Sequence, residues 1–240
     1  MNIEAKKLTT FLSKVRGGEV GPNELKLDFG QTITTNAMNT ENTVIVSAEM
    51  QPTEFSEYSP VGIVAIDDLK GILSILSGFN KVDINKDNNL WIMKEGGRKV
   101  ETILTNPEFI KEAPNKDLSF DETIEIEAKK INDFISQARQ GKEFILKIRT
   151  LPKQLVLESD GKYKFTEIIE AKDAVGGIEV KVGPPFLGPI AEFSGKVTLK
   201  LKNNYPVQIV ERTAGSSVCV TVAPYMDSVP TEEAPKKEEM

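Results

Sequence analysis

The chain contains the stretch IEAKKLTTFLSKVRGG at residues 3–18 and a close copy of it, IEAKKINDFISQARQG, at residues 126–141. Nine of the sixteen aligned positions are identical, and the two copies lie about half of the 240-residue chain apart. A duplication of this size predicts two equivalent domains, and the length suits two domains with one core each. We expect domains at 1–107 and 123–226, a connecting linker at 108–122 and a disordered acidic tail at 227–240.

Both copies have the apolar spacing of a helix that buries one face. Leu8, Phe11, Leu12 and Val15 recur at i, i+3, i+4 and i+7, and the second copy keeps apolar residues at the same places. The remaining positions are rich in lysine and arginine in both copies. The pattern therefore predicts two helices, each with one core face and one positive face.

The rest of the chain indicates an α+β fold. A second helical stretch follows in each half, at 67–77 and more weakly at 184–193. Short strand patterns between turn signals fill most of the remainder. They lie at 25–29, 31–37, 43–50, 62–66, 81–85, 90–94 and 100–105, and then at 144–150, 154–159, 162–169, 178–182, 196–201, 207–212 and 218–223. Two helices packed on a large antiparallel sheet in each domain is the expected architecture.

The composition narrows the classes of function. The chain has no histidine, which removes the commonest general base and metal ligand, and we predict no enzyme, cofactor or metal site. Its single cysteine, Cys219, rules out an intramolecular disulfide and suits a reducing cytoplasm. No stretch approaches the roughly 20 apolar residues of a membrane span. The net charge of −6 argues against nucleic-acid binding unless the 30 basic residues are concentrated on one surface.

Several short stretches resemble the sliding clamps of archaea and eukaryotes, the proliferating cell nuclear antigen family. They are NAMN at 36–39, the Pro206-Val207 entry to a strand, and VAPYMD at 222–227, which precedes an acidic tail. The stretch VAIDDLKGIL at 64–73 also looks like the equivalent part of bacteriophage clamps. The order of these stretches, the duplication and the length agree with the same superfamily.

The resemblance implies a closed ring, here a homotrimer, with helices inside and sheets outside. The strand at 98–106 of one subunit would then pair with the strand at 162–169 of the next. Double-stranded DNA would pass through the ring without sequence-specific contacts, and weak contacts to its phosphates would hold it. The candidate residues for this inner surface are Lys6, Lys7, Lys14, Arg16, Lys70, Lys129, Lys130 and Arg139. The alternative is that these lysines and arginines only solvate helix faces, but the repetition of the same face argues against it.

The resemblance also implies a pocket for a short motif of client proteins, among them a DNA polymerase and a clamp loader. The positions that match are Met38, Asn42, Thr43, Ile45, Leu118, Phe120, Pro206, Val222, Ala223 and Pro224. Leu118 and Phe120 are apolar residues on a polar linker, and such residues need a cover. The alternative is that they only fix the linker to the sheet. The family commonly has a bulkier pair where Asn42 and Thr43 stand.

Two other interpretations remain open on the sequence. The chain could be a subunit of a heterotrimeric or checkpoint clamp, which would not close a ring alone. It could also be an enzyme that uses paired carboxylates, such as Glu125 with Glu127 or Asp67 with Asp68. Acidic residues at the start of a helix favour the helix dipole and often have no other role. Self-association separates the first alternative from a homotrimeric clamp.

Overall fold

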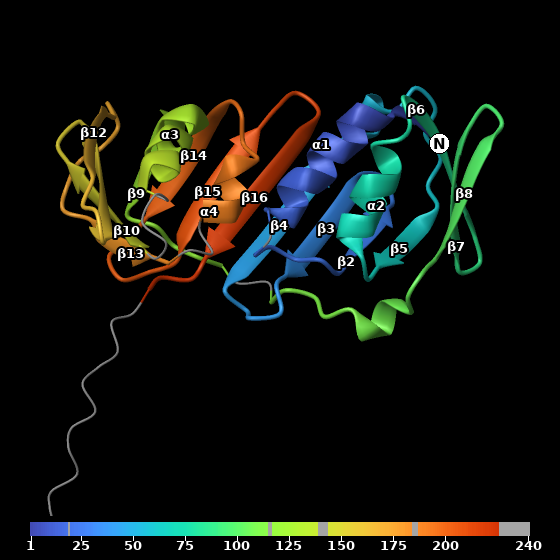
Figure 1. The fold of residues 1–240 in the computed structure, drawn as a ribbon, viewed down its shortest axis with the longest axis horizontal. Coiled ribbons are helices and arrows are strands. Elements are labelled where there is room, and N and C mark those ends of the chain that lie inside the picture. The colour runs from blue at the N-terminus through green and yellow to red at the C-terminus, as the bar shows by residue number, and fades with distance from the viewer. Residues whose placement is uncertain (19, 115–116, 139–143, 184–186, 226–240) are drawn as a thin grey trace, which may run out of the picture.

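The computed structural model describes residues 1–225 except 19, 115–116, 139–143 and 184–186 (Figure 1). The first half contains β1 (Asn2–Glu4), α1 (Ala5–Arg16), β2 (Leu25–Phe29), β3 (Ile33–Met38), β4 (Val44–Met50), η1 (Pro52–Glu54), β5 (Gly62–Ile66), α2 (Leu69–Leu76), β6 (Lys81–Asp87), β7 (Leu90–Glu95), β8 (Arg98–Ile103) and η2 (Pro107–Phe109). The second half contains β9 (Glu122–Glu127), α3 (Ala128–Ala138), β10 (Phe144–Leu151), β11 (Gln154–Gly161), β12 (Thr166–Glu170), β13 (Glu179–Val182), α4 (Leu187–Ala191), β14 (Lys196–Leu201), β15 (Val207–Arg212) and β16 (Ser216–Val222).

The two halves repeat the same order of elements. Each begins with a strand and a helix, continues with four strands and a second helix, and ends with three strands. The repeat therefore equates β1 through β8 with β9 through β16, and α1 and α2 with α3 and α4. This confirms the predicted α+β fold, with two helices on antiparallel sheet in each half.

Three antiparallel sheets organise the described residues. Two of them have four strands, in the orders β1-β6-β7-β8 and β12-β11-β10-β13. The third has eight strands, in the order β5-β2-β3-β4-β16-β15-β14-β9, and it joins the halves by pairing β4 with β16. By the repeat, β4 corresponds to β12 and β16 to β8. Each of the two strands that join the halves therefore has a counterpart. The counterparts, β12 and β8, lie at the outer edges of the two four-stranded sheets.

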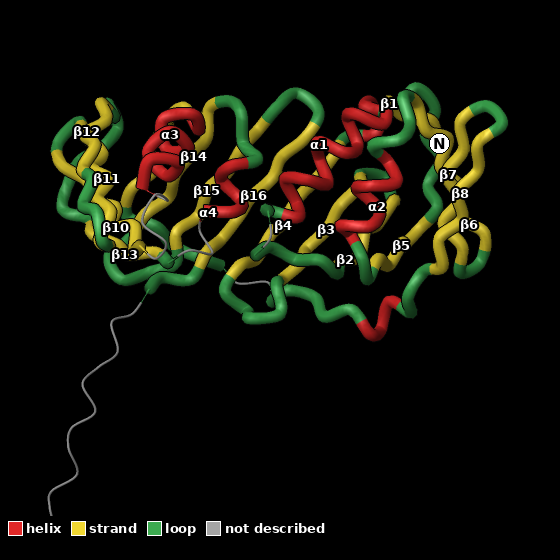
Figure 2. Tube along the Cα trace, viewed as in Figure 1, coloured by secondary structure: helices red, strands yellow, loops and turns green. Residues whose placement is uncertain are grey.

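The helices cover one side of the eight-stranded sheet and leave its other side uncovered by helix (Figures 1 and 2). Alternate strand residues such as Val46 and Val220, which pair across the junction, are fully buried beneath the helices. Most of the buried apolar residues of both halves form one continuous cluster. The helices have the expected apolar faces, and α1 ends at Arg16 and is capped by Gly17, whose φ of 59° places it in the left-handed region.

The structure differs from the sequence-based prediction at the ends of the elements. Neither β1 nor β9 was predicted, because they stand directly before the repeated helices and the helical pattern masks them. The strand expected at 162–169 is shorter and begins at Thr166, since residues 162–165 form the turn in which Phe165 N donates to Ser159 Oγ (2.9 Å). The second helix begins only after Asp68, whose carboxylate caps Gly71 N (3.0 Å).

Candidate nucleic-acid interface and peptide groove

The helix side of the molecule carries most of the predicted basic residues. Lys6 and Lys7 on α1, Lys70 on α2, and Lys129 and Lys130 on α3 are exposed, and Arg16 at the end of α1 is half-buried. Because these helices lie on the same side of the eight-stranded sheet (Figure 1), the cations share one face of the molecule.

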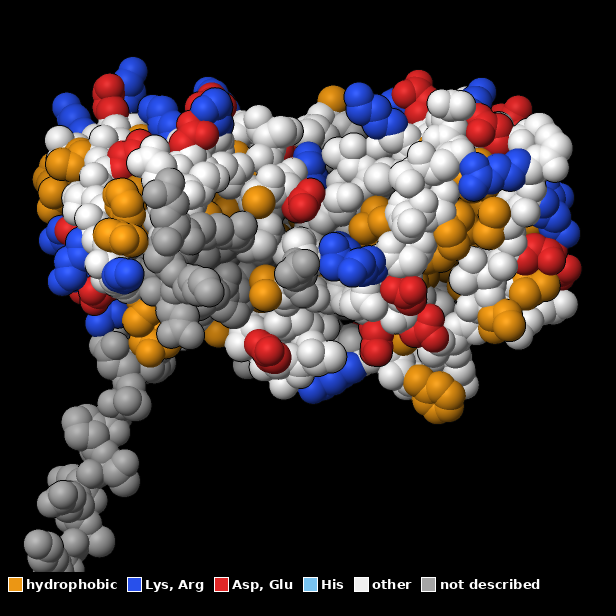
Figure 3. Space-filling model, viewed as in Figure 1, with side chains coloured by type: hydrophobic (Ala, Val, Ile, Leu, Met, Phe, Trp, Pro, Cys, Tyr) orange, Lys and Arg blue, Asp and Glu red, His pale blue; other side chains and the backbone are white. Residues whose placement is uncertain are grey.

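Some of these cations are paired with carboxylates. Lys7 Nζ lies 3.1 Å from a carboxylate oxygen of Glu54, and Lys129 pairs with Asp133 one helical turn on. Within the described part of the chain, Lys6, Arg16, Lys70 and Lys130 have no carboxylate at ion-pair distance. Figure 3 shows blue side chains spread over this face with red ones among them. The helix face is thus mixed in charge, with four cations that no carboxylate neutralises.

Lys14 does not belong to this exposed set. Its residue is only 6% exposed, and its ammonium pairs with the buried carboxylate of Glu211 on β15. Glu211 also accepts hydrogen bonds from Ser194 N (3.1 Å) and Gly195 N (3.4 Å). The reason is geometric: Lys14 lies on the flank of α1 that turns toward the second half, which the sequence of α1 alone does not indicate. Arg139, the remaining predicted residue, lies outside the described residues.

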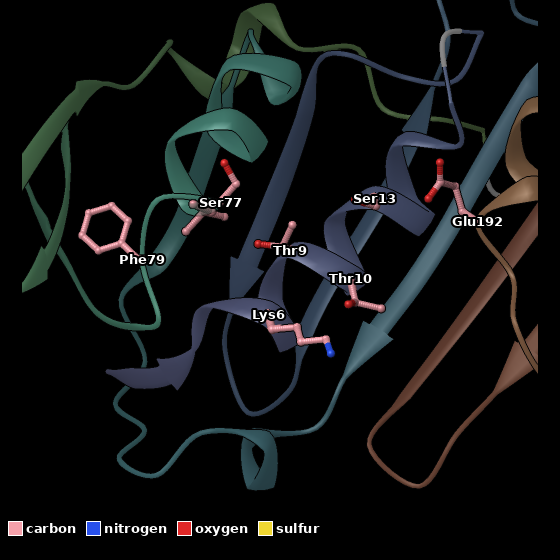
Figure 4. Close-up of a pocket in the computed structure, with 8 residues that line it drawn as sticks. Lys6, Thr9, Thr10, Ser13, Ser77, Phe79 and Glu192 are labelled. Atoms are coloured by element: carbon pink, nitrogen blue, oxygen red, sulfur yellow. The ribbon is translucent and has the colours of Figure 1, made fainter.

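A cleft of about 350 Å³ opens on the helix side between α1 and α2 (Figure 4). Most of the side chains around it are short hydroxyls or apolar, with one cation and one carboxylate. They are Lys6, Thr9, Thr10, Ser13, Leu76, Ser77, Phe79 and Glu192. Hydroxyl groups of this kind contact phosphate oxygens in many protein–DNA interfaces. The sequence indicated the polar side of α1 but not the contribution of Ser77 or Glu192, which come from other elements.

A second groove, of about 220 Å³, lies beside the junction of β4 and β16. Six predicted residues line it, namely Asn42, Thr43, Ile45, Leu118, Pro206 and Ala223. The other lining residues are Asn36, Ser47, Pro114, Gln208, Cys219 and Thr221. Thr221 and Gln208 alternate along their strands with buried core residues such as Val220 and Ile209. The groove is therefore on the side of the sheet that faces away from the helices.

Four predicted residues are not among those that line this groove. Val222 is buried with its side chain in the core, which the alternation along β16 requires. Phe120 packs instead against Tyr205, with ring centroids 5.8 Å apart in an edge-to-face arrangement. Met38 and Pro224 are half-buried close by, since Met38 pairs with Ile45 and Pro224 follows Ala223.

Five of the six lining residues that sequence reasoning missed lie on the strands of the groove floor, and the sixth, Pro114, is on the linker. Ser47 pairs with Asn36 on one side and with Cys219 on the other, so the three stand in one row across the sheet. Each strand alternates polar and apolar residues, which was visible in the sequence. Their assembly depends on the pairing of β4 with β16, which lie in different halves of the chain, and no sequence signal gave that pairing.

Hydrogen bonds fix the linker and the adjacent turn around the groove. Asn36 Nδ2 donates to Ala113 O (2.9 Å), and Asp121 N donates to Leu201 O (3.0 Å), so the linker is held to the sheet at Ala113 and at Asp121. The buried side chain of Asn39 accepts from Thr43 N (2.9 Å) and Val44 N (3.0 Å) through Oδ1. These contacts set the shape of the groove before any ligand is present.

Cys219 lies half-buried on the floor of the groove. Burial raises the pKa of its thiol, while the charge of Lys200, a hydrogen bond with Thr221 and the charge of Arg212 oppose that rise. The net effect keeps the thiol protonated at neutral pH. Cys219 is therefore a small neutral part of the groove floor rather than a thiolate.

Among the residues that the structure describes, no cluster of three or more histidine, cysteine, aspartate or glutamate side chains is arranged to hold a metal ion. Within the same ranges, no helix has the length and apolar character that a membrane crossing requires.

The comparisons with known proteins agree on the fold. No family model matches the chain. The DNA polymerase sliding clamp of Nanoarchaeum equitans is 26% identical to it over 196 residues, which cover 73% of this chain and 79% of that protein. A. fulgidus proliferating cell nuclear antigen (PCNA), solved with the C-terminal region of FEN-1 bound, has a TM-score of 0.83 and 17% identity, covering 95% of this chain and 98% of that chain. PCNA of Entamoeba histolytica has a TM-score of 0.78 and 14% identity, with 94% and 98% covered. This chain therefore has the fold of the PCNA structures and is similar in sequence to a DNA polymerase sliding clamp.

Proposed function

We propose that the chain is one subunit of a ring-shaped DNA sliding clamp that encircles duplex DNA and tethers a DNA polymerase and other replication and repair proteins. The observation that carries this proposal is the repeat of the sheet junction. Within the chain β4 pairs with β16, and the repeat equates these strands with β12 and β8, which are the outer edges of the two four-stranded sheets. The folded chain therefore has the two strands of a second, equivalent junction, with β8 at one end of the molecule and β12 at the other (Figure 1).

A junction between subunits would cover exposed edges that are otherwise a hazard. Each edge strand has a large exposed apolar side chain, with Ile103 on β8 71% exposed and Ile168 on β12 61% exposed. Unpaired apolar edges promote aggregation unless another strand covers them. Pairing β8 of one subunit with β12 of the next is a head-to-tail contact, and such contacts form rings when the rotation closes. Three copies of a two-domain chain would give six equivalent units, the homotrimer that the family resemblance implies.

The charge distribution supports DNA inside this ring. The chain has a net charge of −6, yet Lys6, Arg16, Lys70 and Lys130 share the helix face without carboxylate partners in the described ranges. Cations concentrated on a concave surface attract a polyanion even when the whole protein is acidic. Contacts to phosphate carry no sequence information, so the ring would slide while its closure prevents escape.

The groove beside β4 and β16 supports the docking of clients. It combines apolar side chains from the sheet and the linker, Ile45, Leu118 and Pro206, with hydrogen-bonding side chains, and backbone atoms of Ala113 and Asp121 hold the linker to the sheet. A peptide segment can enter a groove of this kind with little rearrangement. The A. fulgidus PCNA of similar fold is solved with a segment of FEN-1 bound, and we assign the same kind of ligand to this groove.

The mass of the chain in solution and its retention on circular DNA test the proposal. A homotrimer has about three times the 26.5 kDa of the chain, which light scattering measures. A clamp stays on closed circular DNA and slides off when the circle is cut. Equal loss from closed and cut DNA would contradict topological retention, and a persistent monomer would favour a subunit of a heteromeric clamp.

A further inference from the structure

The floor of the groove continues toward a lysine that does not line it. In an antiparallel sheet, directly paired residues have their side chains on the same face. Ile45 pairs with Thr221 and Thr221 pairs with Gln208, and all three line the groove. Lys200 pairs with Gln208 from the next strand. Its side chain therefore stands on the groove side of the sheet, one strand beyond the floor.

Two aromatic rings and two lysines lie beside the end of the groove that Pro206 and Gln208 form. Phe120 packs on Tyr205, and Tyr205 directly precedes Pro206, which lines the groove. Lys200 Nζ lies 5.9 Å from the centre of the Phe120 ring, and Lys202 Nζ lies 5.4 Å from the centre of the Tyr205 ring. The rings hold both ammonium groups near the end of the groove.

Only one of these two lysines is neutralised. Lys202 Nζ lies 3.6 Å from a carboxylate oxygen of Asp121. In the part of the chain that the structure describes, Lys200 has no carboxylate at ion-pair distance, and none of the twelve residues that line the groove is charged. Lys200 is also half-buried, so solvent screens its charge less than that of a fully exposed lysine.

The charge of Lys200 reaches the floor of the groove. Burial raises the pKa of Cys219, which lies on that floor, and the charge of Lys200 is the largest of the effects that lower it. At the opposite end Lys111 donates to Asn42 Oδ1 (3.2 Å), but Lys111 is exposed, and an exposed charge contributes little to a contact. The groove is thus neutral along its length and positive at the Phe120 end.

We propose that this groove selects client segments in which an aspartate or glutamate stands beside the apolar anchor, and that Lys200 binds that carboxylate. This inference rests on the proposed function, since it requires that the groove docks client peptides. It adds a preference that the apolar part of the groove does not supply. Like other charged contacts in a docking surface, the pair would act mainly on specificity.

Peptide binding to the full chain tests the inference. The probe is a fluorescent synthetic peptide of the C-terminal region of A. fulgidus FEN-1, made as a series in which each residue flanking its apolar anchor is Glu or Gln in turn. At one position we expect the Glu peptide to bind about fivefold more tightly than the Gln peptide at low salt, the upper end for a partly exposed ion pair. Lys200→Gln should remove this difference. A further peptide with Lys at that position serves as the reverse test. A Lys200→Glu variant should bind it more tightly than the Glu peptide.

Lys196→Gln is the matched control. Lys196 is an exposed lysine on the same strand and the same face, four residues from Lys200. Its neighbour on the adjacent strand β9 is Glu127, away from the groove. It changes the net charge equally and should leave the preference for Glu intact.

The possible results separate the inference from the function. Equal binding of Glu and Gln peptides at every position, or a preference that survives Lys200→Gln, would overturn the inference and leave docking in place. If no peptide in the series binds, docking in the groove fails and the inference with it. If a synthetic copy of residues 227–240 displaces the Glu peptide from the wild-type chain and not from Lys200→Gln, the partner of Lys200 is the acidic end of the chain itself, and the inference about clients is wrong.

Discussion

Lys14 and Glu211 form a charged contact between the two halves of the chain. Lys14 is on α1, Glu211 is on β15, and both are more than nine-tenths buried. A buried pair is not in itself strong evidence of stability, but removing one partner leaves an uncompensated charge in the interior. The backbone N–H groups of Ser194 and Gly195 further orient the carboxylate. The pair therefore sets how α1 sits against the second half.

We predict that Lys14→Met lowers the free energy of unfolding by about 3–5 kcal/mol, the usual cost of an unpaired buried charge. Adding Glu211→Leu should recover a large part of the loss, because no charge then remains buried. Urea unfolding followed by circular dichroism measures both. Lys7→Met is the control, since Lys7 and Glu54 form a more exposed pair and its loss should cost less than about 1 kcal/mol. A Lys14→Met chain as stable as the wild type would contradict the role of the pair.

Cys219 gives a prediction that depends on pH. Because burial raises the pKa of its thiol, less thiolate is present at pH 8 than in a free cysteine, and Ellman's reagent should react more slowly. Lys200→Gln removes a charge that lowers this pKa, so the reaction should slow further at the same pH. The raised pKa also gives stability that is present below the ordinary pKa of a thiol and is lost as pH rises through the folded-state value. A faster reaction in Lys200→Gln would contradict the placement of that charge.

At the scale of the elements, the basic helix faces carry the predicted contact with DNA. The structure narrows the candidates, since Lys14 is buried and Lys7 and Lys129 already have carboxylate partners. Each phosphate contact that is lost reduces the salt dependence of binding by about one power of salt concentration. The cations without partners should therefore account for most of the attraction.

We predict that Lys6→Ala combined with Lys130→Ala shortens the lifetime of the protein on closed circular DNA and weakens its dependence on salt, while the mass in solution stays unchanged. The control is Lys111→Ala combined with Lys196→Ala, which removes two exposed lysines that lie on the linker and on the groove side of the sheet. Lifetimes are measured by elution of DNA-bound protein from a sizing column. Equal shortening by both variants would show that net charge matters and the helix face does not.

The sequence predicted the elements whose signals are local. The spacing of Leu8, Phe11 and Leu12 was sufficient for α1, and the strand expected at 62–66 matches β5. Features that depend on contacts between distant segments were not predicted. Lys14 has the sequence pattern of a surface lysine, and only the approach of β15 buries it. The groove floor likewise exists because β4 pairs with β16, and Cys219 or Gln208 alone gave no sign of it.

At the scale of the whole molecule, the duplication explains why the chain ends in complementary edges. A single copy of the domain would have one edge of the β8 or β16 type and one of the β4 or β12 type. In the chain, β4 of one copy pairs with β16 of the other. The remaining edges, β8 and β12, have no strand on their outer side within the described part of the chain. The same junction that builds the chain can therefore continue from chain to chain, with the same side of every sheet covered by helices (Figure 1).

This continuation predicts a head-to-tail contact, and two edge variants can test its polarity. Ile103→Asp disables β8 and Ile168→Asp disables β12, because each places a charge on an exposed edge residue that another strand would cover. Each variant alone should be a monomer by light scattering, since a head-to-tail contact needs both edges. An equal mixture should give a dimer and nothing larger, because the intact β12 of one variant can pair with the intact β8 of the other and no edges remain to extend it.

Val175→Asp, which changes an exposed apolar residue outside the edge strands, should leave the wild-type mass unchanged. A two-fold contact of β8 with β8 would behave differently, because Ile168→Asp would then assemble alone and mixing would add nothing.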